Sequence, residues 1–290
     1  MNIFNIFKKE KKPATSIENL SYKGMVINTI SNNVSPQIIT PPTVPVKLST
    51  VDLIKKVETE APHLVDLTKK CFISLEKNNL GDVVAIVILV LDASGSMRWQ
   101  YSTEGRQISD VQKVINRIVP LALKFDNNQS LDVLAFADKT AILNPITLKN
   151  VNNYTINEWN GWQHWMSKLN SAINNEPVTM RYIIDNYRDS KLPVYVAFIS
   201  DGGIDKDAEI KKLLIESSKL PIFWQFIGVG GSNYGILEQF DTLKGRYIDN
   251  ANFFSVDRID SISNETLYNL LGQEFPLWIK LAKSKAILKI

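Results

Sequence analysis

Two short polar segments of the sequence carry the residue types that could hold a metal ion. In the first, Asp92, Ser94 and Ser96 alternate along the chain, so their side-chain oxygens could converge on one point, and Gly95 would permit the sharp turn that this requires. The second segment places Asp201 before two glycines. Carboxylate and hydroxyl oxygens are hard ligands that suit magnesium, manganese or calcium rather than zinc or copper. We therefore predict a divalent-cation site, with magnesium as the expected ion.

Each polar segment follows an apolar, β-branched run of the kind that forms a buried strand. Residues 83–91 precede Asp92, and residues 194–199 end just before the segment that holds Asp201. A continuous apolar run is typical of a strand that is buried on both faces of a parallel sheet. Ligands of open parallel sheets bind beyond the carboxyl ends of the strands. We therefore expect Asp92 and Asp201 to lie close together at one edge of the sheet.

The rest of the chain alternates between the periodicities of strands and helices. Further strands are expected over residues 131–136, 141–148, 222–229 and 253–256. Helices are expected over residues 62–79, 107–125, 205–218 and 235–243, around 182–187, and from 264 onward with a break at Pro276. Ser109 and Gln112 fit a capping box near the start of the helix over 107–125. The alternation predicts an α/β sheet with helices on both faces.

Composition divides the chain into an N-terminal segment and one larger domain. Of its 290 residues, 44% are hydrophobic and 22% are charged, which are ordinary values for a globular protein. Residues 31–45 are rich in proline and small polar residues and have no apolar period. We predict a flexible or disordered segment with a proline-rich linker over residues 1–50, and a folded domain over residues 51–290.

Several classes of protein are disfavoured by the composition. The longest apolar run, residues 83–91, is far shorter than the roughly 20 residues that span a bilayer, and the N-terminus has no secretory pattern. A net charge of +3 without a long basic run gives no footprint for nucleic acid. Two histidines exclude a multi-histidine zinc site, and a lone Cys71 suits a reducing compartment. We therefore expect a cytoplasmic protein without a transmembrane segment or a nucleic-acid partner.

The first polar segment and several other stretches resemble one protein family. The sequence Leu89–Met97, an apolar strand followed by D-x-S-x-S, resembles the metal-ion-dependent adhesion site of von Willebrand factor A domains. The chain is similar to the branch of that family found with bacterial tellurium-resistance and stress-response proteins, and to copine-type domains. The similarity covers residues 65–285 and includes, in order, the stretches Val119–Asp126, Pro221–Gly228, Gly245–Ala251 and Glu274–Trp278.

The resemblance implies a doubly wound, mostly parallel sheet with an antiparallel edge strand, a divalent ion beyond its carboxyl edge, and a protein ligand. Asp92, Ser94 and Ser96 match the first ligand loop of the family, and Asp201 matches an aspartate at or just outside the ligand shell of the ion. Relatives commonly place a threonine ligand in a Gly-Gly-Thr-Asn-Tyr loop, where this chain has Gln163 in the stretch GWQHW. The amide oxygen of Gln163 could take the place of that threonine, although its longer stem changes the reach and the geometry.

The residues and the resemblance together predict a non-enzymatic binding module whose metal ion accepts an Asp or Glu from another protein. One alternative is a metal-free scaffold that keeps the fold but has lost ion binding through Gln163. A second alternative is a magnesium-dependent hydrolase resembling haloacid dehalogenase phosphatases, which carry D-x-D at this place. Ser94 occupies the position of their second aspartate and cannot act as acid and base, and no G-x-S-x-G elbow surrounds it. We therefore do not expect an enzyme.

Two tryptophans near the predicted site fit a partner-binding rim. Trp99 and Trp159 fall on or next to loops at the carboxyl edge of the expected sheet, where aromatic anchors often dominate an interface. The glycine-rich stretch Gly228–Asn233 lacks the last glycine of a nucleotide-binding loop, and we interpret it as a plain turn. Cys71 lies on the apolar face of its helix and is expected to pack as a small hydrophobe.

Overall fold

The computed structural model describes residues 47–159, 169 and 171–289. Residues 1–46, which make up most of the predicted N-terminal segment, and Gln163 lie outside the described residues. The predicted domain boundary at residue 50 therefore stays a prediction. Among the described residues, no helix combines the length and the apolar character needed to cross a bilayer.

In the part of the chain that the structure describes, six strands form one sheet in the order β3-β2-β1-β4-β5-β6. Their bounds are β1 Ile86–Asp92, β2 Asp132–Phe136, β3 Thr140–Ile142, β4 Val194–Gly202, β5 Ile222–Ser232 and β6 Ala251–Val256. All neighbouring strands pair in parallel except β3, which pairs antiparallel with β2 at one edge. The strand order runs outward from β1 in both directions, as in a doubly wound sheet. The predicted α/β fold with an antiparallel edge strand is thus confirmed.

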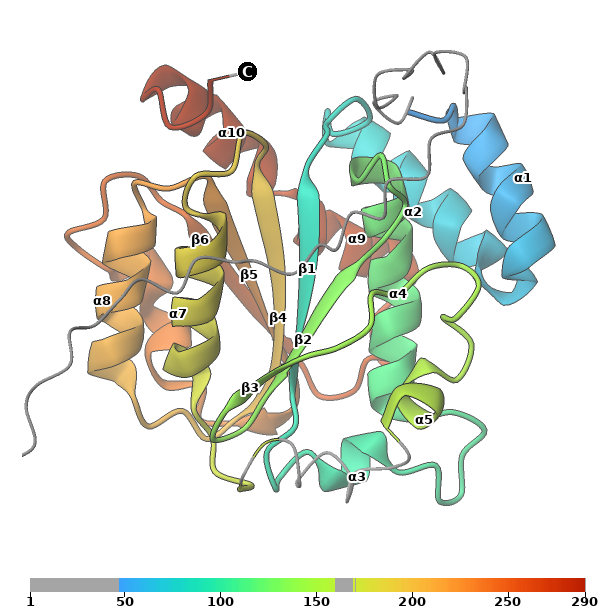
Figure 1. Cartoon of the computed structure of the whole chain (residues 1–290), viewed down its shortest axis with the longest axis horizontal. Helices are drawn as coiled ribbons and strands as arrows, with labels where there is room; N and C mark the ends of the chain where they lie inside the picture. The colour runs from blue at the N-terminus through green and yellow to red at the C-terminus, as the bar shows by residue number, and fades with distance from the viewer. Residues whose placement is uncertain (1–46, 160–168, 170, 290) are drawn as a thin grey trace, which may run out of the picture. The chain divides into compact units, whose positions relative to one another are not determined.

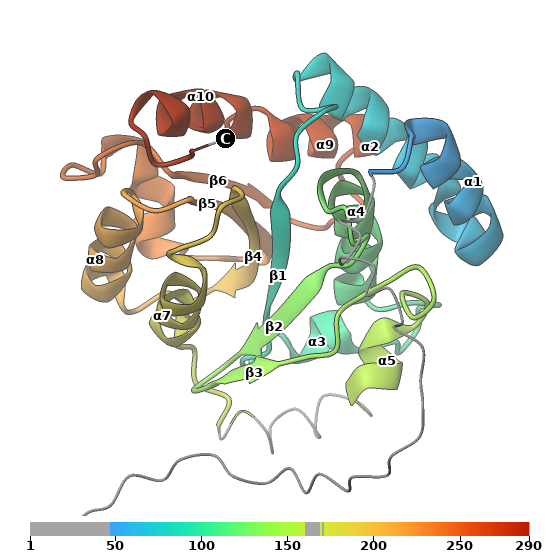
Figure 2. The ribbon, with the colours of Figure 1, turned by 45° about the horizontal axis from the view of Figure 1, so that its top comes forward.

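Helices cover both faces of this sheet. Those that the structure describes are α1 Thr50–Glu60, η1 Pro62–Leu64, α2 Val65–Lys77, α3 Arg98–Tyr101, α4 Asp110–Phe125, α5 Tyr154–Trp159, α7 Glu176–Tyr187, α8 Asp207–Ser217, η2 Gly235–Thr242, α9 Asn264–Gly272 and α10 Phe275–Ser284. The hydrophobic cluster on one face includes residues of α2, α4, α9 and α10, and the cluster on the other face includes residues of α7 and α8 (Figure 1). Figure 2 shows α2, α9 and α10 in a row along the first face.

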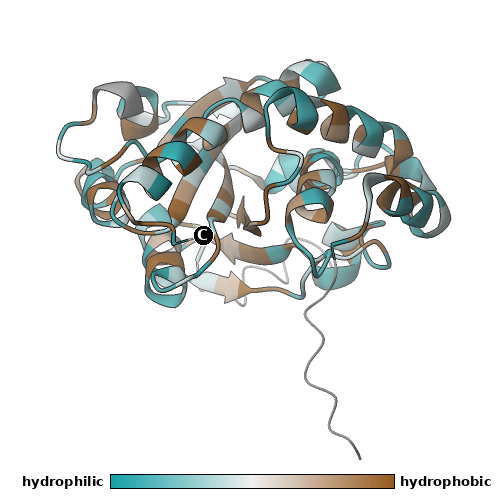
Figure 3. Ribbon diagram, turned by 90° about the horizontal axis from the view of Figure 1, so that it is seen from above, coloured by the Kyte–Doolittle hydropathy of each residue, from teal (hydrophilic) through white to brown (hydrophobic). Residues whose placement is uncertain are grey.

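The continuous apolar run of β1 follows from its place in the centre of the sheet. Val87 and Leu89 pack into the cluster that includes α2 and α4. Ile88 and Val90 point the other way and pack into the cluster of α7 and α8, so both faces of the strand must be apolar. Figure 3 shows this pattern as hydrophobic strands between helices that carry both hydrophobic and hydrophilic residues. The strand ends at Asp92, which places the predicted site at the carboxyl edge of the sheet.

Polar residues and proline set helix ends close to where the sequence predicts them. Ser109 caps α4, and its hydroxyl accepts a hydrogen bond from the amide of Gln112 at 3.1 Å. The capping box is only half formed, because the Gln112 side chain donates to the backbone oxygen of Val151 at 2.8 Å. Pro276 lies in the first turn of α10, which begins after α9 has ended at Gly272. The predicted break in the C-terminal helical region is therefore confirmed.

β4 and β5 extend beyond their predicted ends, and the extension brings β5 against Asp201. β4 continues through Gly202 and β5 through Ser232, with a local shift in their register. The interpretation of Gly228–Asn233 as a plain turn is therefore wrong for most of that stretch. A Cβ atom at Gly231 would lie 1.4 Å from the backbone oxygen of Asp201. Only glycine allows the two strands to approach this closely beside the predicted site.

Replacing Gly231 by alanine is expected to lower the free energy of unfolding by about 1–3 kcal/mol, because the methyl group would push β5 away from Asp201. Urea denaturation followed by circular dichroism would measure the change. Gly272→Ala is the matched control, since a Cβ atom there would meet the Leu80 side chain at an ordinary 3.4 Å. Wild-type stability in both variants would contradict the close approach of the two strands.

Candidate metal centre

Asp92 ends β1 with its side chain fully enclosed by protein. Its Oδ1 accepts a hydrogen bond from the amide of Ser94 at 2.8 Å, and its Oδ2 accepts one from the hydroxyl of Ser200 at 3.0 Å. The hydroxyl of Tyr101 donates to the backbone oxygen of Asp92 at 2.7 Å. Contacts from the following loop and from β4 thus hold the carboxylate, and the contact from α3 holds the backbone of the same residue.

Ser94, Ser96 and Asp201 lie next to one another beyond Asp92. The two serine hydroxyls are 3.1 Å apart, and the Ser96 hydroxyl donates to Oδ1 of Asp201 at 2.9 Å. Ser94 is buried and Ser96 is exposed, so the group opens to solvent on the Ser96 side. The structure thus brings together four of the five residues that the sequence selects as metal ligands. Gln163, the fifth, lies outside the described residues, and its part in the site stays a prediction.

No basic side chain of the described residues is among the groups that shift the pKa of the two carboxyls of this group. Burial raises the pKa of Asp92 to about 7, with hydrogen bonds from Ser94 and Ser200 acting against the shift and the nearby charge of Asp201 adding to it. Burial also raises the pKa of Asp201. Within the described part of the chain, no lysine or arginine lowers the pKa of either carboxyl. A cation bound between them would supply the missing charge.

The donor set suits a hard divalent cation. Two carboxylates and two hydroxyls offer only oxygen ligands, which magnesium, manganese and calcium prefer. No three His, Cys, Asp or Glu side chains converge as metal ligands anywhere in the described residues. Hydroxyl oxygens and water would therefore have to complete the coordination of any ion held by Asp92 and Asp201. The residues present fit such an ion.

Residues 171–176, which the sequence pattern does not single out, cover part of the site. The amide of Gly95 donates to the backbone oxygen of Ala172 at 3.0 Å. Nδ2 of Asn174 donates to the backbone oxygen of Gly202 at 2.9 Å, so the segment joins the loop after β1 to the end of β4. The one signal in its sequence is a proline after Asn-Asn-Glu, which marks the start of a helix but not a contact with β1.

Trp99 provides an exposed aromatic side chain beside the site. It lies on α3, three residues after Ser96, and 62% of its surface is exposed. The guanidinium of Arg98 lies over the indole ring, 5.9 Å from its centroid. Ile173, in the segment that covers the site, is 65% exposed and adds a second apolar side chain. Trp159, the other predicted rim residue, ends α5, and its side chain lies outside the described part of the structure.

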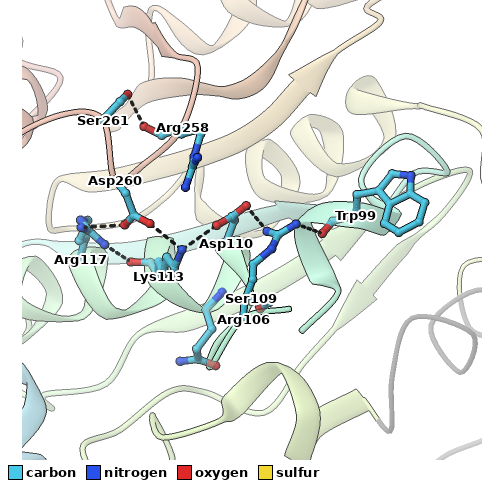
Figure 4. Close-up of polar contacts among 10 residues, drawn as sticks. Trp99, Arg106, Ser109, Asp110, Lys113, Arg117, Arg258, Asp260 and Ser261 are labelled. Carbon is cyan, nitrogen blue, oxygen red and sulfur yellow. Dashed lines mark hydrogen bonds and ion pairs between the residues drawn. The ribbon is translucent and has the colours of Figure 1, made fainter. Parts of the chain in front are cut away.

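An ionic network ties α3 and the loop after it to α4. Arg106 donates to the backbone oxygen of Trp99 at 3.4 Å and pairs with Asp110 at the start of α4 (Figure 4). Lys113 pairs with Asp110 at 3.0 Å and with Asp260, after β6, at 2.6 Å. Burial alone would raise the pKa of Asp260, but its hydrogen bond and charge interaction with Lys113 outweigh burial and lower it. The indole ring points away from this network, so the ion-paired side chains hold the backbone at Trp99 without covering the ring (Figure 4).

Comparisons with known proteins connect this site with a family. A family model described as the vWA domain found in the TerF C terminus matches residues 84–288. The uncharacterized protein YcbR of Bacillus subtilis (strain 168) is 40% identical over 231 residues, which cover 78% of this chain and 90% of YcbR. The matched region contains both polar segments of the site and the whole sheet.

Solved structures resemble the chain less closely. The D319A mutant of the PilB minor pilin from Streptococcus sanguinis aligns with a TM-score of 0.45 and 13% identity, over 69% of this chain and 64% of the pilin. The chain thus spans less than two thirds of the length of the pilin. Proximal thread matrix protein 1 from the mussel byssus, with a zinc-occupied MIDAS motif, aligns with a TM-score of 0.39 and 18% identity, over 69% of this chain and 48% of that protein. At these scores neither structure assigns a ligand to this chain.

Asp92→Asn is expected to stabilise the metal-free protein, and to do so more at pH 8 than at pH 5. Folding raises the pKa of Asp92 from 3.8 to about 7, so the folded protein binds more protons than the unfolded chain between these values. The free energy of unfolding of the wild type therefore falls as the pH rises through this window. Asparagine has no charge to bury, so Asp92→Asn should avoid this decrease and be about 1–4 kcal/mol more stable than the wild type at pH 8. Urea denaturation in EDTA at the two pH values measures the effect. A variant that is less stable than the wild type at pH 8 would contradict the buried, uncompensated charge.

Proposed function

The chain belongs to the vWA-TerF-like family, and on this premise we propose that it is a non-enzymatic binding module whose divalent cation accepts an acidic side chain from another protein. The observation that carries the proposal is the connected group of Asp92, Ser94, Ser96 and Asp201 at the carboxyl edge of the sheet. Asp92 and Asp201 would hold the cation by charge, and the two hydroxyls would complete its oxygen ligands. The bound cation would supply the positive charge that attracts a carboxylate of the partner.

The distribution of charge within this group favours an external acidic ligand. The carboxylate of Asp92 is enclosed on the inner side, whereas the exposed member of the group, Ser96, carries a neutral hydroxyl. An incoming Asp or Glu would therefore meet the ion beside a neutral ligand rather than beside another anion. Magnesium is the proposed ion because it binds few protein carboxylates and keeps water at its other positions, while manganese or calcium would use the same oxygens.

Exposed apolar side chains beside the site would provide the rest of the partner interface. Trp99 and Ile173 are 62% and 65% exposed, and aromatic residues held on a fixed backbone are common anchors of protein interfaces. The predicted rim contact of Trp159 remains part of the proposal. We include in the same proposal the cytoplasmic setting, in bacterial tellurite resistance or stress response, that the sequence resemblance implies.

A metal-free scaffold is the second candidate, and one contact favours it. The Ser96 hydroxyl donates directly to Asp201, so part of the group satisfies its hydrogen bonds without an ion. No contact among the described residues favours the hydrolase alternative. Ser94 stands where such an enzyme needs a carboxyl group as its general acid and base, and its hydroxyl, which lies against that of Ser96, cannot replace a carboxyl group in this role. The hydrolase alternative would be supported only if the wild type released phosphate from a generic ester in the presence of magnesium and Asp92→Ala did not.

Calorimetric titration with magnesium, manganese and calcium separates the metal-dependent module from the scaffold. We expect one divalent ion per chain to bind the wild type, and at least about tenfold weaker binding in Asp92→Ala, because the loss of a charged ligand removes more than 1.4 kcal/mol. Asp189→Asn, in an exposed loop after α7, is the matched control and should bind as the wild type does. Absence of binding to the wild type at millimolar ion would favour the scaffold.

Affinity capture with the purified chain as bait tests the partner interface. Trp99→Ala should lose most of the captured partner and keep its affinity for the ion, because the indole ring is 62% exposed and takes no part in the hydrogen bonds that link Asp92, Ser94, Ser96 and Asp201. Asp92→Ala, and the wild type in EDTA, should lose the same partner. Capture that is unaffected by EDTA would contradict an interaction through the metal ion.

A further inference from the structure

Glu176 is a buried carboxylate without a hydrogen-bond partner in another residue. It is the first residue of α7, and its exposed fraction is 1%. Both of its carboxylate oxygens are enclosed and have no hydrogen-bond partner in any other described residue, and only its own backbone amide opposes the effect of burial by a hydrogen bond. A buried charge without a partner costs several kcal/mol, and native proteins rarely keep one unless a ligand or a proton compensates it. No motif in the sequence assigns this residue a role.

The neighbours of Glu176 place it close to the metal site. The charge of Asp92 acts on the Glu176 carboxyl, as do Lys206 and Asp205 in the loop after β4. Burial raises the pKa of Glu176 to about 8, Asp92 and Asp205 add to the shift, and Lys206 opposes it. The ammonium of Lys206 already donates to Oδ1 of Asn175 at 2.8 Å, and it forms no ion pair with Glu176.

The chain just before Glu176 is attached near three strand ends. Asn174 donates to the backbone oxygen of Gly202 at the end of β4, and Asn175 donates to the backbone oxygen of Asp138 after β2 at 3.1 Å. The backbone of Ala172 accepts a hydrogen bond from the loop after β1. Oδ1 of Asn174 is a further buried acceptor without a partner. Asn174 and Glu176 thus place buried oxygen atoms, without a partner in another described residue, in a segment that is attached to the ends of these strands.

We infer that Glu176 is an outer carboxylate of the cation site, which attracts the ion held by Asp92 and Asp201 and accepts hydrogen bonds from water in its coordination shell. The inference rests on the proposed function. Glu176 does not converge with the two aspartates as a third direct ligand, so it acts from outside the ligand shell. Magnesium keeps several waters, whose hydrogens need acceptors, and outer acceptors of this kind tune the affinity of metal sites.

The inner position of Glu176 leaves the solvent side of the site unchanged. Because its side chain is enclosed and Ser96 is exposed, the third negative charge would be shielded from solvent and would not face an approaching partner. Asp92, Asp201 and Glu176 would carry a formal charge of −3 against the +2 of the ion. We therefore expect the site to bind divalent cations much more tightly than monovalent ones. We also expect Glu176 to raise the affinity for the ion without itself becoming a direct ligand.

Calorimetric titration of the full chain with magnesium and with manganese tests the inference. Glu176→Gln should weaken binding about tenfold, in line with the 10–100-fold effects of outer-shell partners, and should raise the Tm of the metal-free protein. Glu176→Asp keeps the charge and should recover part of the affinity. Glu209→Gln, which removes an exposed charge from the first turn of nearby α8, is the control and should bind as the wild type does.

The outcomes separate this inference from the proposed function. Wild-type affinity in Glu176→Gln, with clear ion binding by the wild type, would overturn the role of Glu176 and leave the metal-dependent module standing. Equal losses in Glu176→Gln and Glu209→Gln would also overturn it, since general charge would then explain the effect. A wild type that binds neither ion would overturn both proposals. A smaller magnesium-induced rise of Tm in Glu176→Gln than in Glu176→Asp would support the role of the charge.

Discussion

The enclosed carboxylate of Asp92 is the constraint on which the site depends. It lies at the end of a central strand whose two faces are filled by apolar side chains, so it can neither turn to solvent nor reach a cationic side chain in the described structure. Hydrogen bonds from Ser94 and Ser200 lower the cost of this burial but leave a net negative charge. The neighbouring Asp201 adds to that charge, and a divalent ion is the simplest group that would neutralise both.

The surrounding elements hold the Asp92 carboxylate in a fixed place and leave the site open to solvent on the Ser96 side. Gly231 lets β5 approach Asp201, and residues 171–176 join the loop after β1 to the end of β4. The network of Arg106, Asp110 and Lys113 ties α3 to α4 and so fixes the backbone of Trp99. A rigid site of this kind can recognise a ligand without first ordering its own loops, which lowers the entropic cost of binding.

The sequence predicts the fold, and the grouping of Asp92, Ser94, Ser96 and Asp201, more completely than it predicts the contacts that hold this group in place. Apolar runs that end in Asp92 and near Asp201 define both the sheet and its carboxyl edge, because buried parallel strands leave a strong local signal. The contacts of Gly231 and of Ala172 join segments far apart in the chain, and no local pattern encodes them. Two helices also leave little signal in the sequence. α3 is too short to show a helical period, and the apolar period of α1 is weak because it buries mainly Leu53 and Val57.

A crystal structure of the full chain grown with manganese, with anomalous diffraction recorded at the manganese edge, tests the central claim most directly. We predict one strong anomalous peak enclosed by Asp92, Ser94, Ser96 and Asp201, with hydroxyl oxygens at roughly 2.0–2.6 Å, as expected for hard divalent ions. Water in the coordination shell should lie between the ion and Glu176. Crystals without a peak at this position, in which the Ser96 hydroxyl still donates to Asp201, would contradict it.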